Sequence, residues 1–270
     1  MHPEPRRRLS PLQKRLPGGR TAVTICVGVR CKDGLLIAAD RQMTSPSYTF
    51  HECKLHSLKW KNGRAVWGFT AKNADILNIF WPKLEERFAT DAVITRGEIA
   101  DALKEVLSAT LSKKEHFATL FGAWTDGENS ILLHSEGTIV METGPWEIIG
   151  YGDSPLSRYL RGMFLKCPNR TVFQASMMAI YLVRQAKTYD GQYVGGGTDV
   201  YMIDENHCTR VIDVAQTDIL EKEMQRIEVI TMALFATLSD SASSSDWIER
   251  RYKEFRGKVD PFCERIRQMK

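Results

Sequence analysis

The sequence predicts an α+β fold, a four-layer α/β/β/α sandwich in which helices cover the outer sides of two antiparallel sheets. The main observation is the order of the predicted elements, which runs strands, two helices, strands, two helices, strands and one helix. Strands and helices grouped in this way do not suit a parallel sheet, in which they alternate along the chain. The second observation is that the 270 residues contain no internal repeat, which favours one main domain.

Four strands are predicted before the first helix, over 24–30, 35–39, 54–60 and 65–69. In the first strand Ile25, Val27 and Val29 alternate with other residues, the period of a β-strand. Asp33-Gly34 marks a hairpin turn. The run 35–39 is continuously apolar, which is typical of a strand buried on both faces.

The following elements are predicted by helical periodicity and by capping signals. Apolar residues recur every fourth position from Ile76 to Phe88, and Pro82 is expected to kink this helix or to end its first segment. Thr95 and Glu98 form a capping box that opens the second helix. Later strands are predicted over 117–124, 131–134, 139–142, 146–149, 200–203 and 210–214, and later helices over 154–164, 171–187 and 218–238.

The sequence divides into three parts. Residues 1–23 form a basic leader or propeptide, which we expect to be disordered because the first twenty residues hold four prolines and a Gly-Gly pair. The main domain covers 24–238, and 239–270 contain a Ser-rich linker and a short helix over 247–255. The leader carries much of the excess behind the net charge of +4, but no aromatic residues lie between its basic ones, so we expect no nucleic-acid partner.

Composition indicates a globular protein without a membrane segment. With 43% hydrophobic and 26% charged residues it is ordinary for a soluble domain, and no apolar run approaches the ~20 residues of a membrane span. No apolar core follows the N-terminal arginines, so we expect no secretory signal and a cytoplasmic protein. The six cysteines form no CxxC pair, and the histidines show no metal spacing, which predicts neither a metal nor a cofactor.

Residues that can carry chemistry gather between positions 24 and 54. Thr24 and Gly28 lie on the first predicted strand, Lys32-Asp33-Gly34 forms the hairpin turn, Asp40 ends the second strand and Lys54 opens the third. With these residues at this spacing, the sequence resembles the proteasome-type N-terminal-nucleophile (Ntn) hydrolases, as a divergent 20S proteasome subunit-like protein. The segments 70–75, 150–155 and 194–200 also look like that family, and the likeness extends over 21–214.

The resemblance implies a catalytic role for each matching residue. A threonine hydroxyl needs a base before it can attack, and the α-amine of an N-terminal Thr24 can serve because an amine titrates near ~8. Lys54 would lower the pKa of that amine and favour the developing alkoxide, and Asp40 would keep Lys54 charged and oriented. The backbone N–H of Ala71 would stabilise the oxyanion, and Tyr151 could relay a proton.

The sequence also departs from the family pattern at several positions. Active members have Gly before the nucleophile and two serines at positions where this chain has Val23, Tyr151 and Val194. A β-branched Val23 can hinder self-cleavage. A partnering aspartate is matched only loosely, by Asp190.

Three functions therefore stay open. The leading hypothesis is a threonine-type peptidase or amidohydrolase, with Thr24 as nucleophile after removal of the leader. The first alternative is a non-catalytic, proteasome-like scaffold in which Thr24 stays internal, and the second is a nucleic-acid-associated protein that uses the basic tail. The partners implied by the leading hypothesis are a peptide or protein substrate and further copies of the chain in a ring or stacked homo-oligomer.

Overall fold

The computed structural model describes residues 24–44, 49–71, 74–88, 93–112, 115–127, 129–150, 159, 162, 170–189, 191 and 193–268. The predicted leader and most of the predicted helix over 154–164 lie outside these residues. Within the described part, no helix combines the length and the apolar character needed to cross a membrane.

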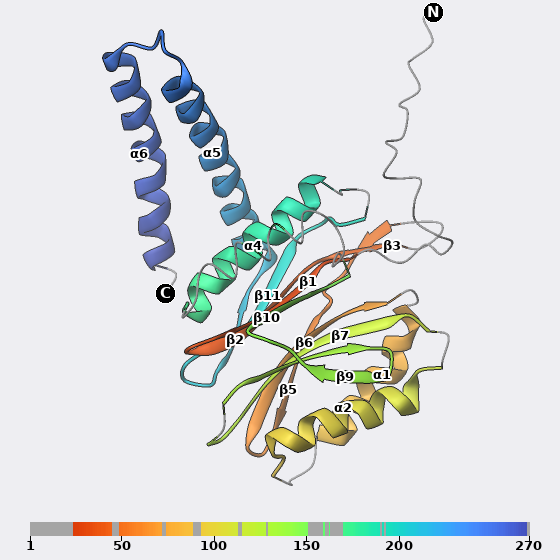
Figure 1. Cartoon of the computed structure of the whole chain (residues 1–270). Helices are drawn as coiled ribbons and strands as arrows, with labels where there is room; N and C mark the ends of the chain where they lie inside the picture. The colour runs from red at the N-terminus through yellow and green to blue at the C-terminus, as the bar shows by residue number, and fades with distance from the viewer. Residues whose placement is uncertain are drawn as a thin grey trace, which may run out of the picture.

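The described strands form three antiparallel sheets (Figure 1). The first sheet has the order β10 (Trp146–Ile149), β1 (Cys26–Cys31), β2 (Gly34–Asp40), β11 (Thr198–Ile203) and β12 (Thr209–Ile212). The second sheet has the order β5 (Leu55–Trp60), β6 (Gly63–Ala71), β7 (Phe117–Thr125), β8 (Ile131–Glu136) and β9 (Ile139–Glu142). The third consists of β3 (Gln42–Thr44) and β4 (Thr49–His51). The predicted hairpin is confirmed, since β1 and β2 pair from Cys26 with Ala39 to Cys31 with Gly34.

Helices lie on the outer faces of the two large sheets (Figure 1). The second sheet is covered by α1 (Leu77–Phe88), which follows a short 3-10 turn, η2 (Ala74–Ile76), and by α2 (Arg96–Thr110). Pro82 lies inside α1 and does not end it. The first sheet carries α4 (Val172–Tyr189), which packs on β1, β2 and β11.

The C-terminal helices form a hairpin of their own. Only the first part of α5 (Val214–Ser239) packs on the first sheet, where Thr217, Leu220 and Met224 are buried. The rest of α5 extends away from the sheets and pairs with α6 (Ser245–Gln268) (Figure 1). The predicted helix over 247–255 was therefore too short, because Val259, Phe262 and Ile266 continue its half-buried apolar face.

The predicted fold class is thus wrong. A four-layer sandwich of two sheets accounts neither for the third sheet of β3 and β4 nor for the α5–α6 hairpin. The physical reason for the hairpin is the composition of α5, whose apolar residues continue beyond the edge of the first sheet and are partly covered by α6 instead.

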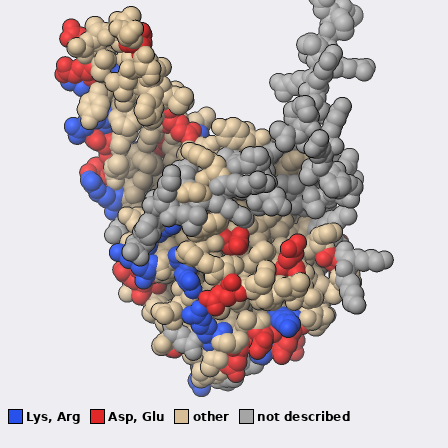
Figure 2. All heavy atoms as spheres, in the orientation of Figure 1, with Lys and Arg blue, Asp and Glu red and all other residues tan. Residues whose placement is uncertain are grey.

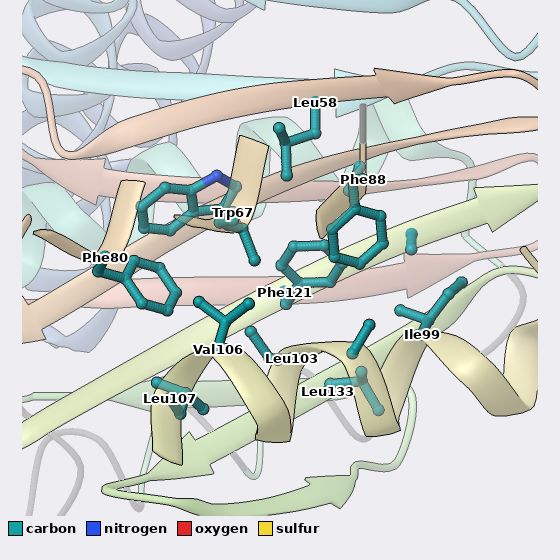
Figure 3. Close-up of a cluster of buried hydrophobic side chains, with 14 of the residues drawn as sticks. Leu58, Trp67, Phe80, Phe88, Ile99, Leu103, Val106, Leu107, Phe121 and Leu133 are labelled. Atoms are coloured by element: carbon teal, nitrogen blue, oxygen red, sulfur yellow. The ribbon is translucent and has the colours of Figure 1, made fainter. Parts of the chain in front are cut away.

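Apolar side chains fill three regions around the two large sheets. One cluster lies between the first sheet and α4, and a second between the second sheet and α1 and α2, where Phe80, Phe88 and Leu103 meet Trp67 and Phe121 (Figure 3). The third lies between the two sheets. Because β1 and β2 contribute alternate residues to the first and third clusters, both faces of these strands are buried, as the continuous apolar run of β2 indicates.

Candidate functional site

Thr24, Asp40 and Lys54 are brought together by the ends of three strands. Thr24 lies just before β1, Asp40 is the last residue of β2 and Lys54 comes directly before β5 of the other large sheet. The Thr24 hydroxyl donates to Asp40 Oδ1 over 3.0 Å, and Lys54 Nζ donates to the same oxygen over 2.8 Å and also to Thr24 Oγ1. Their exposed fractions are 4%, 0% and 1%, so water competes little with these contacts.

The Asp40 carboxylate is the hub of this cluster. Besides Thr24 and Lys54, its Oδ1 accepts the backbone N–H of Ile25 at 3.1 Å. Its Oδ2 accepts the N–H groups of Gln42 and Gly195, each at 3.1 Å. A buried carboxylate is tolerated only when it is paired and hydrogen-bonded, and these five donors meet that need while they fix its orientation.

Lys54 is the buried cation of the site. Burial lowers the pKa of its ammonium below the usual value, and the charge and hydrogen bond of Asp40 oppose that effect, with smaller contributions from Cys26 and Asp199. An ammonium next to a hydroxyl stabilises the alkoxide that forms when the hydroxyl loses its proton. The cluster therefore places a cation where it can stabilise an alkoxide on Thr24 Oγ1.

The remaining predicted residues are not joined to this cluster. Ala71 ends β6, opposite Phe117, and its side chain packs against the core under α1 and α2. No hydrogen bond among the described residues links Ala71 to Thr24, so its oxyanion role stays a prediction. Tyr151, Asp190 and Val23 lie outside the described residues. Val194 is fully buried in the cluster between the first sheet and α4.

Several residues of the site were missed by sequence reasoning. Gln42 and Gly195 contribute backbone N–H groups, which no side-chain pattern can reveal. Arg41 and Asp199 form an ion pair beside the cluster, with Nε and Oδ2 3.2 Å apart. Their closeness depends on the pairing of β2 with β11, two segments far apart in sequence. Gly150 opens the segment 150–155, which the sequence singled out only by its likeness to the family and without a role for this glycine.

Gly150 holds the backbone next to Thr24. Its φ is +85°, in the left-handed region that favours glycine, and a Cβ added there would clash with the carbonyl oxygen of Thr24. Gly150→Ala should therefore displace Thr24 and lower the free energy of unfolding by about 2 kcal/mol or more. Chemical denaturation measures this loss. The matched control is Gly127→Ala, because Gly127 has φ +78° but free space around the added Cβ. Equal losses in the two variants would contradict the proposed close approach.

A cavity of about 810 Å³ opens elsewhere in the molecule. It is lined by residues of the turn between β1 and β2, such as Lys32 and Asp33, and by Trp124 and His207. Thr24 and Asp40 lie at the other end of β1 and β2. None of the three clustered residues lines the cavity, so we locate the candidate chemistry at Thr24 and not in this hollow.

Comparison with known proteins gives a fold but no family. No family model and no curated protein sequence matches the chain. Among solved structures, Anbu (ancestral beta-subunit) from Yersinia bercovieri matches with a TM-score of 0.66 and 19% identity, over 78% of this chain and 97% of that one. Anbu from Hyphomicrobium sp. strain MC1 matches with a TM-score of 0.64 and 14% identity, over 78% and 97% of the two chains.

The chain has an Anbu-type fold. A third match, Anbu from Pseudomonas aeruginosa, has a TM-score of 0.62 at 14% identity and covers 78% of this chain and 96% of that one. These neighbours correct the resemblance inferred from sequence, because Anbu proteins are proteasome-like but form a family distinct from 20S subunits. At such low identity the likeness establishes the fold alone.

Proposed function

We propose that this chain is a threonine-type hydrolase of peptide or related amide bonds, with Thr24 as nucleophile once residues 1–23 have been removed. The observation that carries the proposal is the buried cluster in which Lys54 and Asp40 both hydrogen-bond to the Thr24 hydroxyl. A threonine that only stabilised a strand end would not need a buried ammonium beside its oxygen, since burying that charge is costly.

The chemistry would proceed by acyl transfer. The free α-amine of Thr24 accepts the hydroxyl proton while Oγ1 attacks the substrate carbonyl carbon, and Lys54 stabilises the alkoxide. The tetrahedral intermediate collapses when the C–N bond breaks, and the amine leaving group takes the proton. Water then attacks the resulting ester, the acid product leaves and the Thr24 hydroxyl is restored.

The intact mass of the purified full-length chain tests the proposal. We expect a species that lacks residues 1–23, because an N-terminal Thr24 is needed for the amine to act as a base. A chain that stays full length, and that hydrolyses no peptide amide after the leader is removed artificially, would instead support the scaffold.

The non-catalytic scaffold remains the second candidate because of Val194. The resemblance places a serine there in active members, and in this chain the position holds a buried valine packed in an apolar cluster. Hydroxyl groups near an α-amine can relay its proton, and Val194 has none to offer. A scaffold would keep the fold and the buried cluster while Thr24 stays internal.

We also propose that the chain assembles with copies of itself through α5. The outer half of this helix, 229–239, has no charged residue, and Val229, Met232, Phe235 and Leu238 are 53–68% exposed. By contrast, α6 turns its apolar side to α5 and its charges outward, and Figure 2 shows a broad uncharged surface on the hairpin bordered by charged residues. A helix that is apolar on all sides is normally covered. The Anbu structure from Pseudomonas aeruginosa is that of a helical assembly.

Negative charges introduced on the exposed apolar face of α5 should dissociate the proposed assembly of identical chains. The double variant Met232→Glu/Phe235→Glu is expected to sediment as a smaller species than the wild type at micromolar concentration, because two carboxylates would be buried at the contact. Lys253→Glu on the outer side of α6 is the matched control, since its side chain is 74% exposed and should leave the mass unchanged. An unchanged mass in the double variant would place the contact elsewhere.

A further inference from the structure

A second ion pair lies beside the Thr24 cluster. Arg41 follows Asp40 in the chain, and Asp199 stands opposite Ala39 where β11 pairs with β2. Arg41 Nε and Asp199 Oδ2 lie 3.2 Å apart, without the alignment of a hydrogen bond. The Asp199 side chain is 8% exposed and that of Arg41 33%, so this pair reaches from the interior to the surface.

The ion pair lies where the glycine loop 195–197 is fastened to the end of β2. The backbone N–H of Arg41 donates to the carbonyl oxygens of Gly195 and Gly197 at 3.2 and 3.0 Å, and that of Gln42 donates to Gly195 at 3.0 Å. The N–H of Gly195 in turn donates to Asp40 Oδ2. A shift of Arg41 therefore moves the groups that hold the second oxygen of Asp40.

The same pair also adjoins the segment that carries Lys54. The thiol of Cys53, the residue before Lys54, donates to the Leu55 carbonyl oxygen at 3.4 Å and lies 3.8 Å from the hydroxyl of Tyr201. Tyr201 is two residues from Asp199 in β11, so the two side chains lie on the same face of the sheet. Burial raises the pKa of the Cys53 thiol, and the negative charge of Asp199 raises it further. The thiol therefore stays protonated and able to donate to the Leu55 carbonyl oxygen.

We propose that Arg41 and Asp199 act as a positioning pair for the Thr24 site, in which Arg41 holds the glycine loop that supports Asp40 and Asp199 places a negative charge beside the segment that carries Lys54. The inference rests on the proposed function, because it assigns the pair a role in activating Thr24. Neither residue contacts the Thr24 hydroxyl in any described hydrogen bond, so both would act through Asp40 and Lys54.

Removal of Asp199 and removal of Arg41 should shift the pKa of Lys54 in opposite directions. Lys54 contacts Asp40 at the end of β2 and Thr24 just before β1, and Cys26 in β1 and Asp199 in β11 act on its pKa through their charge. The negative charge of Asp199 raises the pKa of Lys54, so its removal leaves burial less opposed and lowers that pKa. Removal of Arg41 leaves the charge of Asp199 uncompensated, which favours the protonated lysine.

The decisive experiment titrates Lys54 by NMR with ¹³C-labelled lysine in the Thr24→Ala chain, in which every variant keeps residues 1–23, and the Lys54 signal is identified by its loss in Lys54→Met. In Asp199→Asn the midpoint should fall by about half a pH unit or more. In Arg41→Gln it should rise or stay unchanged. Asp204→Asn is the matched control, since Asp204 pairs with Arg210 just beyond the far end of β11, and it should not move the midpoint.

Asp199→Asn and Arg41→Gln break the same ion pair. If this ion pair only stabilised the fold, both variants would change the titration midpoint of Lys54 in a similar way. Midpoints that move in the same direction, or no shift in Asp199→Asn, would overturn the inference. The titration does not depend on catalysis. A wild-type chain that never cleaves or hydrolyses would defeat the proposed function while this result still decides the role of the pair.

Discussion

Lys54→Met is expected to abolish self-cleavage before Thr24 and to lower the free energy of unfolding by about 3 kcal/mol. The loss of stability follows because Lys54 is the buried counter-ion of Asp40, and without it the carboxylate stays buried with hydroxyl and backbone donors only. The loss of cleavage follows because no cation remains to favour the Thr24 alkoxide, which should slow the reaction at least about 10²-fold. Denaturant titration and time-resolved intact mass measure the two effects.

Two further variants separate charge from packing. Lys59→Met makes the same substitution at an exposed position of β5 and should change neither quantity. The double variant Asp40→Asn/Lys54→Met should be less destabilised than the sum of the single variants, because no buried charge is left unpaired. Additive losses would show that Lys54 and Asp40 do not depend on each other, contrary to the observed contact.

Local signals predicted the parts of the fold that depend on neighbouring residues. The turn at Asp33-Gly34 correctly placed the β1–β2 hairpin. The capping box of Thr95 and Glu98 correctly placed the start of α2, where the Thr95 N–H donates to the Glu98 carboxylate. In both cases the determining groups lie within a few residues of each other, so their chemistry can be inferred directly from their spacing.

The features that were missed depend on tertiary contacts. The strands β3 and β4 have three residues each, which is too short for an alternation of polar and apolar residues to be recognised. The length of α6 depends on α5, against which its apolar residues pack, and Pro261 within it would suggest an earlier end. Dependence on tertiary contacts therefore explains why the sequence analysis predicted two sheets and not three, and why it did not predict the α5–α6 hairpin.

The residues of the candidate site also depend on contacts between segments that are far apart in the sequence. Thr24, Asp40 and Lys54 could be proposed as a group only through the resemblance, since 16 and 14 residues separate them from one another in sequence. Arg41 and Asp199 carry no motif at all, and only the register of β2 against β11 brings them together. Charged residues at strand ends are ordinarily exposed, so nothing in the sequence distinguishes this pair from surface residues.

Substitution of Thr24 is expected to remove the proposed activity completely. Thr24→Ala should leave the chain at full length and without peptide-amidase activity, because the attacking oxygen is gone. Thr24→Ser should retain part of both, since its hydroxyl can still contact Lys54 and Asp40. Thr119→Ala is the matched control, because Thr119 is also fully buried but donates to the Gly68 carbonyl, away from the site. It should lose stability yet still be cleaved.

The mass of the Thr24→Ala chain decides between self-processing and other causes. While Val23 is attached, the nitrogen of Thr24 is an amide and cannot accept the proton, so the first cleavage must be driven by the Thr24 hydroxyl with Lys54 and Asp40 beside it. Release of residues 1–23 from Thr24→Ala at the wild-type rate would mean that another protease makes the cut. If, in addition, an artificially exposed Thr24 hydrolysed no amide, the buried cluster would be a structural support within a scaffold.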